Sequence, residues 1–217
     1  MTSLVLFDFD GTLTKCDTTR YLLMALGMER AHRVLSALPH ALAMKRAAND
    51  FELQRAKVAC IGAMLGGMPV SQLDQGLIRF GRRVRRLVRP EVKTALVQQA
   101  ECHRGVVVTA SPDFVVRAVF PELEVPVLGT QFSVVNGMFT GEVQGDICYG
   151  AEKVARVRAY IDEKCAIGTD VAEAWSDALS DRPMMDMAPV RHWVCASDRD
   201  SAAIQILDPS GHIITVR

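Results

Sequence analysis

Near the start of the chain stands the stretch LVLFDFDGTLT, residues 4–14, in which an apolar run meets two acids and a glycine. Residues 4–7 are predicted to form a buried strand of a parallel sheet, because such strands are short and continuously apolar. Asp8 and Asp10 follow two positions apart, and they would share one face if the strand continued through them. Ligands of open α/β sheets bind at the carboxyl ends of the strands, so this stretch predicts both the fold class and the place of its chemistry.

The two acids suit two kinds of chemistry. Carboxylate oxygens are ligands that Mg²⁺ prefers, and an aspartate can also act as a nucleophile that takes up a phosphoryl group. Gly11 then lets the chain turn, and Thr12 offers a backbone or hydroxyl donor. The alternative is a plain polar turn, since Asp and Gly are ordinary turn residues, and an Asp-x-Asp pair alone favours that alternative.

Strand-like and helix-like segments alternate through most of the remaining chain. Further strands are predicted at residues 105–109, 126–129, 172–175 and 192–196, with helices at 90–102, 112–119 and 151–161. Such alternation is typical of an α/β fold, here a Rossmann-like, doubly wound parallel sheet with helices on both faces. Residues 131–141 carry an Asn-Gly pair between alternating residues, which predicts a β-hairpin beside the main sheet.

Residues 15–86 interrupt this alternation, because they are rich in Ala, Leu, Met and Arg and lack β-branched runs. They predict several helices, with breaks near Pro39 and near the segment Gly66-Gly67-Met68-Pro69. An insertion directly after the first strand would lie over the carboxyl end of that strand. The predicted organisation is therefore a core of residues 1–14 and 87–217 with a helical cap of residues 15–86.

The composition excludes several classes of protein. Hydrophobic residues make up 49% of the 217 residues, enough for a large core, and 25 basic residues balance 25 acidic ones, so the whole chain has no general attraction for nucleic acid. The six cysteines show neither metal-ligand spacing nor a disulfide framework. The N-terminus lacks a signal-peptide pattern, and the apolar stretch Val34–Met44 is too short and interrupted to span a bilayer. We therefore expect a cytoplasmic protein without an integral membrane segment; the sequence predicts no oligomeric state.

Polar residues follow two later predicted segments. Thr109 ends the strand at 105–109, where its hydroxyl could bind a phosphoryl oxygen; a β-branched residue that merely ends a strand is an equally good interpretation. Ser111 is a rival ligand, but Ser111-Pro112 is typical of a helix N-cap followed by proline at the first helical position. Lys153 stands near a helix start, where an anionic partner would offset its unfavourable position in the helix dipole. The alternative for Lys153 is a solvated side chain.

A second pair of acids, Asp177 and Asp181, lies between the predicted strand at 172–175 and a following helix. The functional interpretation makes Asp177 a Mg²⁺ ligand and places Asp181 beside Lys153 or the waters of the metal. The alternative for Asp181 is an acid that stabilises the start of a helix.

Taken in order, four of these segments resemble the motifs of the haloacid dehalogenase superfamily of phosphotransferases. They are residues 7–14, 106–109, Lys153 and 177–181. The helical insertion after the first motif and the hairpin before Lys153 are similar to the phosphoserine phosphatase-like branch, subfamily IB. Ser176 is a departure, since the family often has glycine there.

The resemblance implies a Mg²⁺-dependent phosphatase in which Asp8 takes the phosphoryl group and binds the metal. Asp10 would protonate the leaving oxygen, activate the hydrolytic water and bind the metal through its carbonyl. Thr109 and Lys153 would hold phosphoryl oxygens, and Asp177 would complete the protein ligands. Further residues expected to contact substrate or support the site are Gly11, Thr12, Ala110, Ser111 and Asp181.

The substrate is less well predicted than the chemistry. Asp17 and Arg20 could face the site, but a helix start and a solvated arginine are at least as good interpretations. The basic run at residues 82–89 is either a solvated helix face or a surface that attracts an anionic substrate or membrane. With the apolar stretch at 34–44, it is similar to a branch that dephosphorylates phosphatidylglycerophosphate, phosphatidylglycerophosphatase C. We expect a small phosphomonoester, with a lipid phosphate and peripheral membrane contact as the alternative.

Three other functions are alternatives to a phosphatase. A dehalogenase would not need the second acid, Asp10. A phosphomutase or other phosphotransferase could share all four motifs, so that only its products would distinguish it. A non-catalytic phosphate-binding module would be expected to lack at least one motif, and this chain lacks none.

Overall fold

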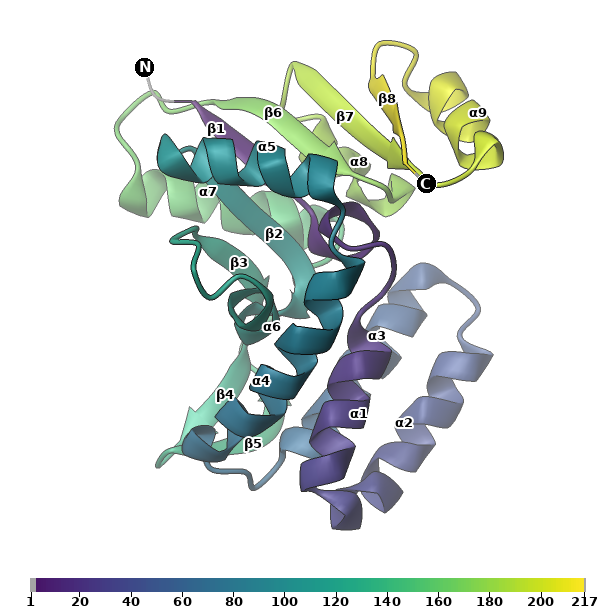
Figure 1. The fold of residues 1–217 in the computed structure, drawn as a ribbon, viewed down its shortest axis with the longest axis vertical. Helices are drawn as coiled ribbons and strands as arrows, with labels where there is room; N and C mark the ends of the chain where they lie inside the picture. The colour runs from purple at the N-terminus through teal and green to yellow at the C-terminus, as the bar shows by residue number, and fades with distance from the viewer. Residues whose placement is uncertain (1–2, 217) are drawn as a thin grey trace.

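The computed structural model describes residues 3–216, and of residue 29 the backbone alone. A six-stranded parallel sheet lies at its centre, with the strand order β3-β2-β1-β6-β7-β8 (Figure 1). The strands are β1 (Leu4–Phe7), β2 (Gly105–Pro112), β3 (Val127–Thr130), β6 (Val171–Ser176), β7 (Val190–Cys195) and β8 (His212–Thr215). The predicted doubly wound parallel sheet is confirmed, and β8 at its edge is a strand that the sequence pattern does not predict.

The side chains of β1 alternate between two cores, one on each face of the sheet. Val5 and Phe7 belong to the core that holds residues of α5 (Pro90–Glu101) and α6 (Asp113–Val119). Leu4 and Leu6 belong to the core that holds residues of α7 (Ala151–Lys164), α8 (Arg182–Met185) and α9 (Asp198–Leu207). Helices therefore cover both faces of the sheet, and β1 is buried on both sides, as its continuous apolar sequence predicts.

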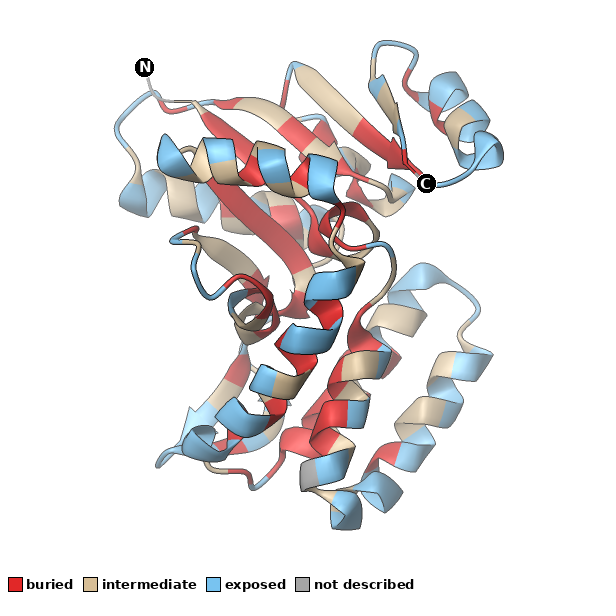
Figure 2. Cartoon of the chain, viewed as in Figure 1, coloured by how far each residue is buried: buried red, intermediate tan, exposed pale blue. Residues whose placement is uncertain are grey.

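The insertion of residues 15–86 contains four α-helices: α1 (Thr19–Glu29), α2 (Val34–Arg46), α3 (Asp50–Leu65) and α4 (Leu73–Val84). They form a separate layer beside the carboxyl end of the sheet, and α2 is the most exposed of them (Figure 2). The predicted break at Gly66–Pro69 separates α3 from α4. No helix within residues 3–216 has both the length and the apolar composition needed to cross a membrane.

The predicted break at Pro39 is wrong, because Pro39 lies inside α2. Proline cannot donate the backbone hydrogen bond and crowds the preceding turn. In α2 the proline is exposed and lines an open groove between α2 and α3. The helix therefore loses one hydrogen bond but keeps its packing against α3.

The predicted hairpin is present as β4 (Phe132–Val135) and β5 (Met138–Val143). Its turn residues Asn136 and Gly137 have φ angles of 51° and 75°, the left-handed values that favour an Asn-Gly turn. Backbone hydrogen bonds join the hairpin to the inserted helices: Gly67 N donates to Phe139 O at 2.8 Å and Phe139 N to Met68 O at 2.9 Å. The hairpin thus connects the far end of the insertion to the core.

The chain enters and leaves the inserted helices through two adjacent segments. Thr14 and Val88 form an antiparallel bridge. Lys15 N donates to Leu87 O, and Arg89 N donates to Leu13 O, both at 2.8 Å. The insertion is therefore attached to the carboxyl end of β1 by a short two-stranded connection.

Candidate active site

Asp8 and Asp10 lie on a turn and not on a continuation of strand β1. The condition under which they would share one face of a strand is therefore not met. Strand β1 ends at Phe7, and Phe9–Leu13 forms a single turn in which Gly11 has a φ of 89°. A side chain at Gly11 would overlap the carboxylate of Asp177. Glycine is therefore required twice, for its backbone conformation and for the close approach of Asp177.

Lys153 joins two of the predicted carboxylates. Its Nζ donates to Asp8 Oδ1 at 2.6 Å and to Asp181 Oδ2 at 2.7 Å, and the lysine is 2% exposed. Ser176 Oγ also donates to Asp181 Oδ2 at 2.7 Å, which gives the hydroxyl at this departure from the family pattern a defined partner. The two carboxylates raise the pKa of Lys153 against the effect of its burial, so the lysine stays charged.

Thr12 links the first and last acidic motifs. Its buried hydroxyl lies 3.1 Å from Asp8 Oδ2 and 2.8 Å from Asp177 Oδ1, and it accepts from Asp177 N at 2.9 Å. A hydroxyl donates one hydrogen, so it can serve only one of the two carboxylates at a time. Asp8, Lys153, Asp181 and Asp177 thus form one connected cluster.

The carboxylate of Asp10 accepts hydrogen bonds from two donors outside this cluster. Thr18 N donates to Asp10 Oδ1 at 2.7 Å, and Ser111 Oγ donates to Asp10 Oδ2 at 2.6 Å. The predicted helix-capping role of Ser111 is wrong, because α6 has Pro112 at its N-cap position and strand β2 continues through Ser111. Thr109 therefore lies within β2 and does not end it, and its Oγ1 accepts from Ser111 N at 3.0 Å.

Burial disfavours the charged form of three carboxylates in this cluster. It raises the pKa of Asp8 to about 8 and that of Asp177 to about 6, with neighbouring carboxylates adding to the effect and Lys153 opposing it. Burial, with the nearby charge of Asp17, also raises the pKa of Asp10. One lysine therefore does not balance the negative charge that these groups carry when ionised, and a bound cation would do so.

The oxygen atoms around Asp8 and Asp177 are candidate ligands for a divalent metal ion. Within residues 3–216, no three side chains of His, Cys, Asp or Glu stand in an arrangement that could hold a metal. Asp8 and Asp177 are nevertheless brought together through Thr12, and backbone carbonyls and waters commonly complete an oxygen site for Mg²⁺. The excess negative charge and the oxygen ligands suit Mg²⁺. Two carboxylates, those of Asp8 and Asp177, would bind the ion, and a third is not in place.

A small cavity of about 70 Å³ opens at this cluster. It contains most of the predicted site residues together with residues from the inserted helices and from the loop before α7. Its lining is Asp8, Asp10, Thr19, Gln54, Lys57, Thr109, Ala110, Ser111, Tyr149, Lys153, Ala178, Ser180 and Asp181. Both the core and α3 of the insertion therefore contribute to one cavity.

The sequence pattern does not identify the residues that come from α3. Lys57 forms an ion pair with Asp17, which fixes both side chains near Asp10. Gln54 lies one turn earlier on the same helix. Nothing in the spacing of α3 distinguishes these positions from solvated ones. Arg20 lies outside the cavity lining, where its guanidinium stacks on the ring of Tyr21 at 4.6 Å.

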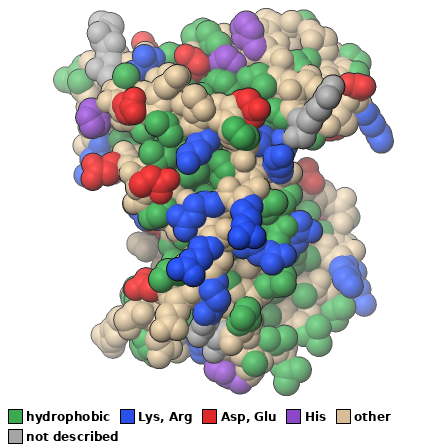
Figure 3. Space-filling view, viewed as in Figure 1, with side chains coloured by type: hydrophobic (Ala, Val, Ile, Leu, Met, Phe, Trp, Pro, Cys, Tyr) green, Lys and Arg blue, Asp and Glu red, His purple; other side chains and the backbone are tan. Residues whose placement is uncertain are grey.

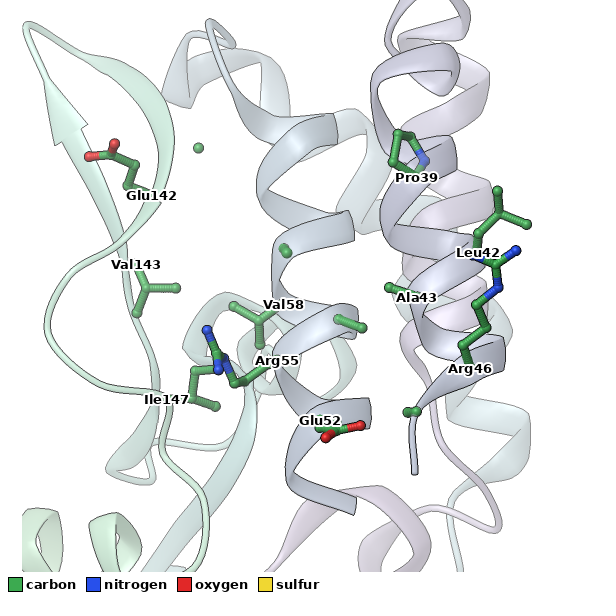
Figure 4. A pocket seen from close by; sticks show the side chains of 14 residues that line it. Pro39, Leu42, Ala43, Arg46, Glu52, Arg55, Val58, Glu142, Val143 and Ile147 are labelled. Carbon is green, nitrogen blue, oxygen red and sulfur yellow. The ribbon is translucent and has the colours of Figure 1, made fainter. Parts of the chain in front are cut away.

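A larger open groove of about 880 Å³ lies between α2, α3 and strand β5 (Figure 4). Val58, Val143 and Ile147 give it an apolar wall, and Arg46 and Arg55 lie on the helical side. Phe51 of α3 contacts Tyr149 of the cavity, with ring centroids 6.1 Å apart. This aromatic contact joins α3 to the loop before α7.

Comparisons with known proteins agree with this fold. A family model described as haloacid dehalogenase-like hydrolase matches residues 5–186. Protein CicA of Caulobacter vibrioides is 31% identical over 192 residues, which cover 85% of this chain and 82% of CicA.

Two solved structures show the same fold at low sequence identity. A protein with unknown function from Bordetella pertussis Tohama I is 20% identical, with a TM-score of 0.77 over 99% of both chains. A substrate-bound phosphoserine phosphatase is 19% identical, with a TM-score of 0.58 over 100% of this chain and 94% of its own.

Proposed function

The chain belongs to the haloacid dehalogenase-like hydrolases, and from this membership we propose that it hydrolyses a phosphate monoester through a phosphoryl intermediate on Asp8. The observation that carries the proposal is the contact of Lys153 Nζ with Asp8 Oδ1 in a cavity that also contains Asp10. A charged lysine beside a nucleophilic carboxylate suits phosphoryl transfer, where most of the catalysis is positioning and charge stabilisation.

In the first step, a carboxylate oxygen of Asp8 attacks phosphorus, and the bond from phosphorus to the ester oxygen breaks. Asp10 gives its proton to that leaving oxygen, and its raised pKa favours the protonated form that this role needs. Thr109 and Lys153 contact the phosphoryl oxygens. In the second step, Asp10 takes a proton from water as the water attacks phosphorus, which releases inorganic phosphate and restores Asp8.

Asp8, Asp177 and the carbonyl of Asp10 would hold Mg²⁺. When bound, the ion neutralises negative charge on the phosphoryl group and on the carboxylates around it. Thr12 orients both carboxylates, and Asp181 with Ser176 holds Lys153 in place. Residues 15–86 act as a cap in this proposal, and Lys57 and Gln54 of α3 face the leaving group.

A rate measurement tests this mechanism directly. We expect wild-type protein to hydrolyse para-nitrophenyl phosphate with Mg²⁺ and to lose this activity in EDTA. Asp8→Asn should lower kcat by about three orders of magnitude or more, because it removes the nucleophile. Asp162→Asn is the matched control, because Asp162 is exposed on α7 and makes the same change of charge. Activity that survives Asp8→Asn or chelation would contradict the mechanism.

The apolar groove, which α3 lines as it also lines the cavity, favours a second candidate substrate, a phosphate ester with a long apolar group, such as a lipid phosphate. Hydrolysis of butyl phosphate and dodecyl phosphate, below their aggregation limits, separates the two candidates. A dodecyl ester that gives a clearly higher kcat/KM than the butyl ester supports the apolar substrate, and equal values support a small phosphomonoester. Phosphoserine, sugar phosphates and phosphatidylglycerophosphate complete the panel. Release of inorganic phosphate distinguishes a phosphatase from a mutase.

A further inference from the structure

The whole chain has no net charge, but residues 15–86 and the rest of the chain carry opposite net charges. Residues 15–86 contain 13 Lys and Arg against 5 Asp and Glu, a net charge of +8. The remaining residues contain 12 Lys and Arg against 20 Asp and Glu, a net charge of −8. The inserted helices therefore carry a local positive field even though the protein is neutral.

Much of that charge gathers on one face of α4 and the turn after it. Residues 75–90 include six arginines and no acid, and basic side chains cover this part of the surface in Figure 3. Arg82, Arg83 and Arg86 are exposed, and their side chains make no ion pair or hydrogen bond within residues 3–216. Arg83 lies over the ring of Tyr21, 5.2 Å from its centroid. These arginines are thus available to an external anion.

The arginines surround an apolar recess of about 330 Å³ between α1 and α4. Tyr21, Ala25 and Phe80 line it, together with Met24 and Met28. Met24 is 58% exposed and Met28 is 74% exposed, although both are long apolar side chains. The face therefore combines exposed guanidinium groups with exposed, flexible apolar side chains.

We propose that this face of α1 and α4 binds the surface of an anionic phospholipid bilayer. Arg82, Arg83 and Arg86 pair with lipid phosphates, while Met24 and Met28 enter the boundary between headgroups and acyl chains. Basic and apolar residues side by side are the composition of helices that lie in a membrane interface. The inference concerns where the protein binds and is independent of the reaction at Asp8.

The exposed methionines favour a bilayer over a nucleic acid. A nucleic-acid surface would also pair with the arginines, but its phosphates offer no apolar environment for Met24 and Met28. A bilayer uses both components, because burial of methionine adds to the electrostatic attraction.

Co-sedimentation with large unilamellar vesicles tests the proposal. We expect binding to vesicles of phosphatidylcholine and phosphatidylglycerol at a 7:3 ratio, and no binding to phosphatidylcholine alone. Arg82→Gln/Arg83→Gln/Arg86→Gln should lower the partition coefficient about 100-fold at low salt, since each basic residue contributes about fivefold near such a surface. Sodium chloride at 500 mM should weaken wild-type binding in the same direction.

Two matched controls separate this face from general charge and hydrophobicity. Arg158→Gln/Lys164→Gln/Arg199→Gln removes the same charge from exposed positions outside residues 15–86. This variant should bind within about threefold of wild type. Met24→Gln/Met28→Gln should weaken binding more than Ile167→Gln/Ile206→Gln, which changes two exposed isoleucines elsewhere. Circular dichroism and thermal melting verify that each variant is folded.

Three results would overturn the proposal. The first is equal binding to neutral and anionic vesicles. The second is unchanged binding of the arginine variant when its fold is intact. The third is tight binding of a fluorescent DNA duplex with no binding to either vesicle, which would assign the face to nucleic acid.

Discussion

Ser111 has a more specific place in the site than its sequence context indicates. Its hydroxyl donates to Asp10 Oδ2 at 2.6 Å, and Thr18 N holds the other oxygen of that carboxylate. Ser111 therefore fixes the direction in which Asp10 presents its proton. Under the proposed mechanism it is a positioning residue, whose loss acts through Asp10.

The choice of leaving group reveals that role. We expect Ser111→Ala to reduce kcat for an alkyl phosphate by about 10²-fold, because misplaced general acid catalysis loses part of its 10²–10⁴-fold contribution. The reduction should be much smaller for para-nitrophenyl phosphate, whose leaving oxygen needs little protonation. Ser111→Thr, which keeps the hydroxyl, should restore most of the activity.

Thr109→Val provides the comparison in the same strand. If Thr109 contacts the phosphoryl group, its replacement lowers the rate for both esters by a similar factor. An equal loss for both esters in Ser111→Ala would contradict the positioning role.

The sequence predicts most of the residues that the core contributes to the site, because they lie at the carboxyl edge of one parallel sheet. Asp8, Asp177 and Lys153 come together since the carboxyl ends of β1 and β6 and the start of α7 meet at one edge. Lys57 and Gln54 could not be predicted in this way. Their place depends on how α3 packs over the sheet, and no local pattern in α3 encodes that packing.

At the scale of elements, the sequence predicts five of the six strands of the main sheet, including the edge strand β3, and misses the other edge strand, β8. The four residues of β8 are exposed or half-buried, and only Ile213 and Ile214 among them are apolar, so the run is too short to predict a strand by itself. The helix α2 tolerates Pro39 because packing against α3 maintains it. In α2, tertiary packing thus overrides local propensity.

The contact between α3 and the hairpin provides an element-scale prediction. A side chain at Gly62 would overlap the backbone oxygen of Gly141 in β5. We expect Gly62→Ala to destabilise the protein by about 1–3 kcal/mol, because helix and strand cannot both keep their positions. Urea unfolding provides the measurement.

Gly27→Ala is the matched control, because the added carbon would meet only Val34 Cγ2 at an ordinary 3.9 Å. Alanine has the higher helix propensity, so this variant should be unchanged or more stable by up to about 1 kcal/mol. Equal effects of the two changes would show that the close approach of α3 to β5 does not limit stability.

At the scale of the whole molecule, one buried carboxylate holds together the far edge of the sheet. Asp208, 2% exposed, accepts from Arg191 Nε at 2.6 Å and from Trp193 Nε1 at 2.8 Å. Hydrogen bonds from Arg191 keep the pKa of Asp208 well below its ordinary value. The residue thus connects the end of α9 to β7.

This depressed pKa predicts how stability depends on pH. Asp208 contributes fully above the unfolded-state pKa of about 4, and its contribution is lost as pH falls toward the lower folded-state value. We expect Asp208→Asn to lower the free energy of unfolding at pH 7 by about 2 kcal/mol. The difference from wild type should shrink between pH 4 and pH 2, as followed by urea unfolding. A difference that stays constant over this range would contradict the assignment.

The pairing of β1 has a consequence for the order of events during synthesis. Val5 pairs with Gly105 and Leu6 with Ala174, so β1 leaves the ribosome before both of its neighbours and stays without β6 until synthesis has passed residue 174. The inserted helices have local contacts and can form during that delay, whereas the apolar strand stays unpaired. A nascent chain that stalls before Gly105 therefore exposes an aggregation-prone segment, and this neutral, compact protein would depend on chaperones most strongly before its sheet exists.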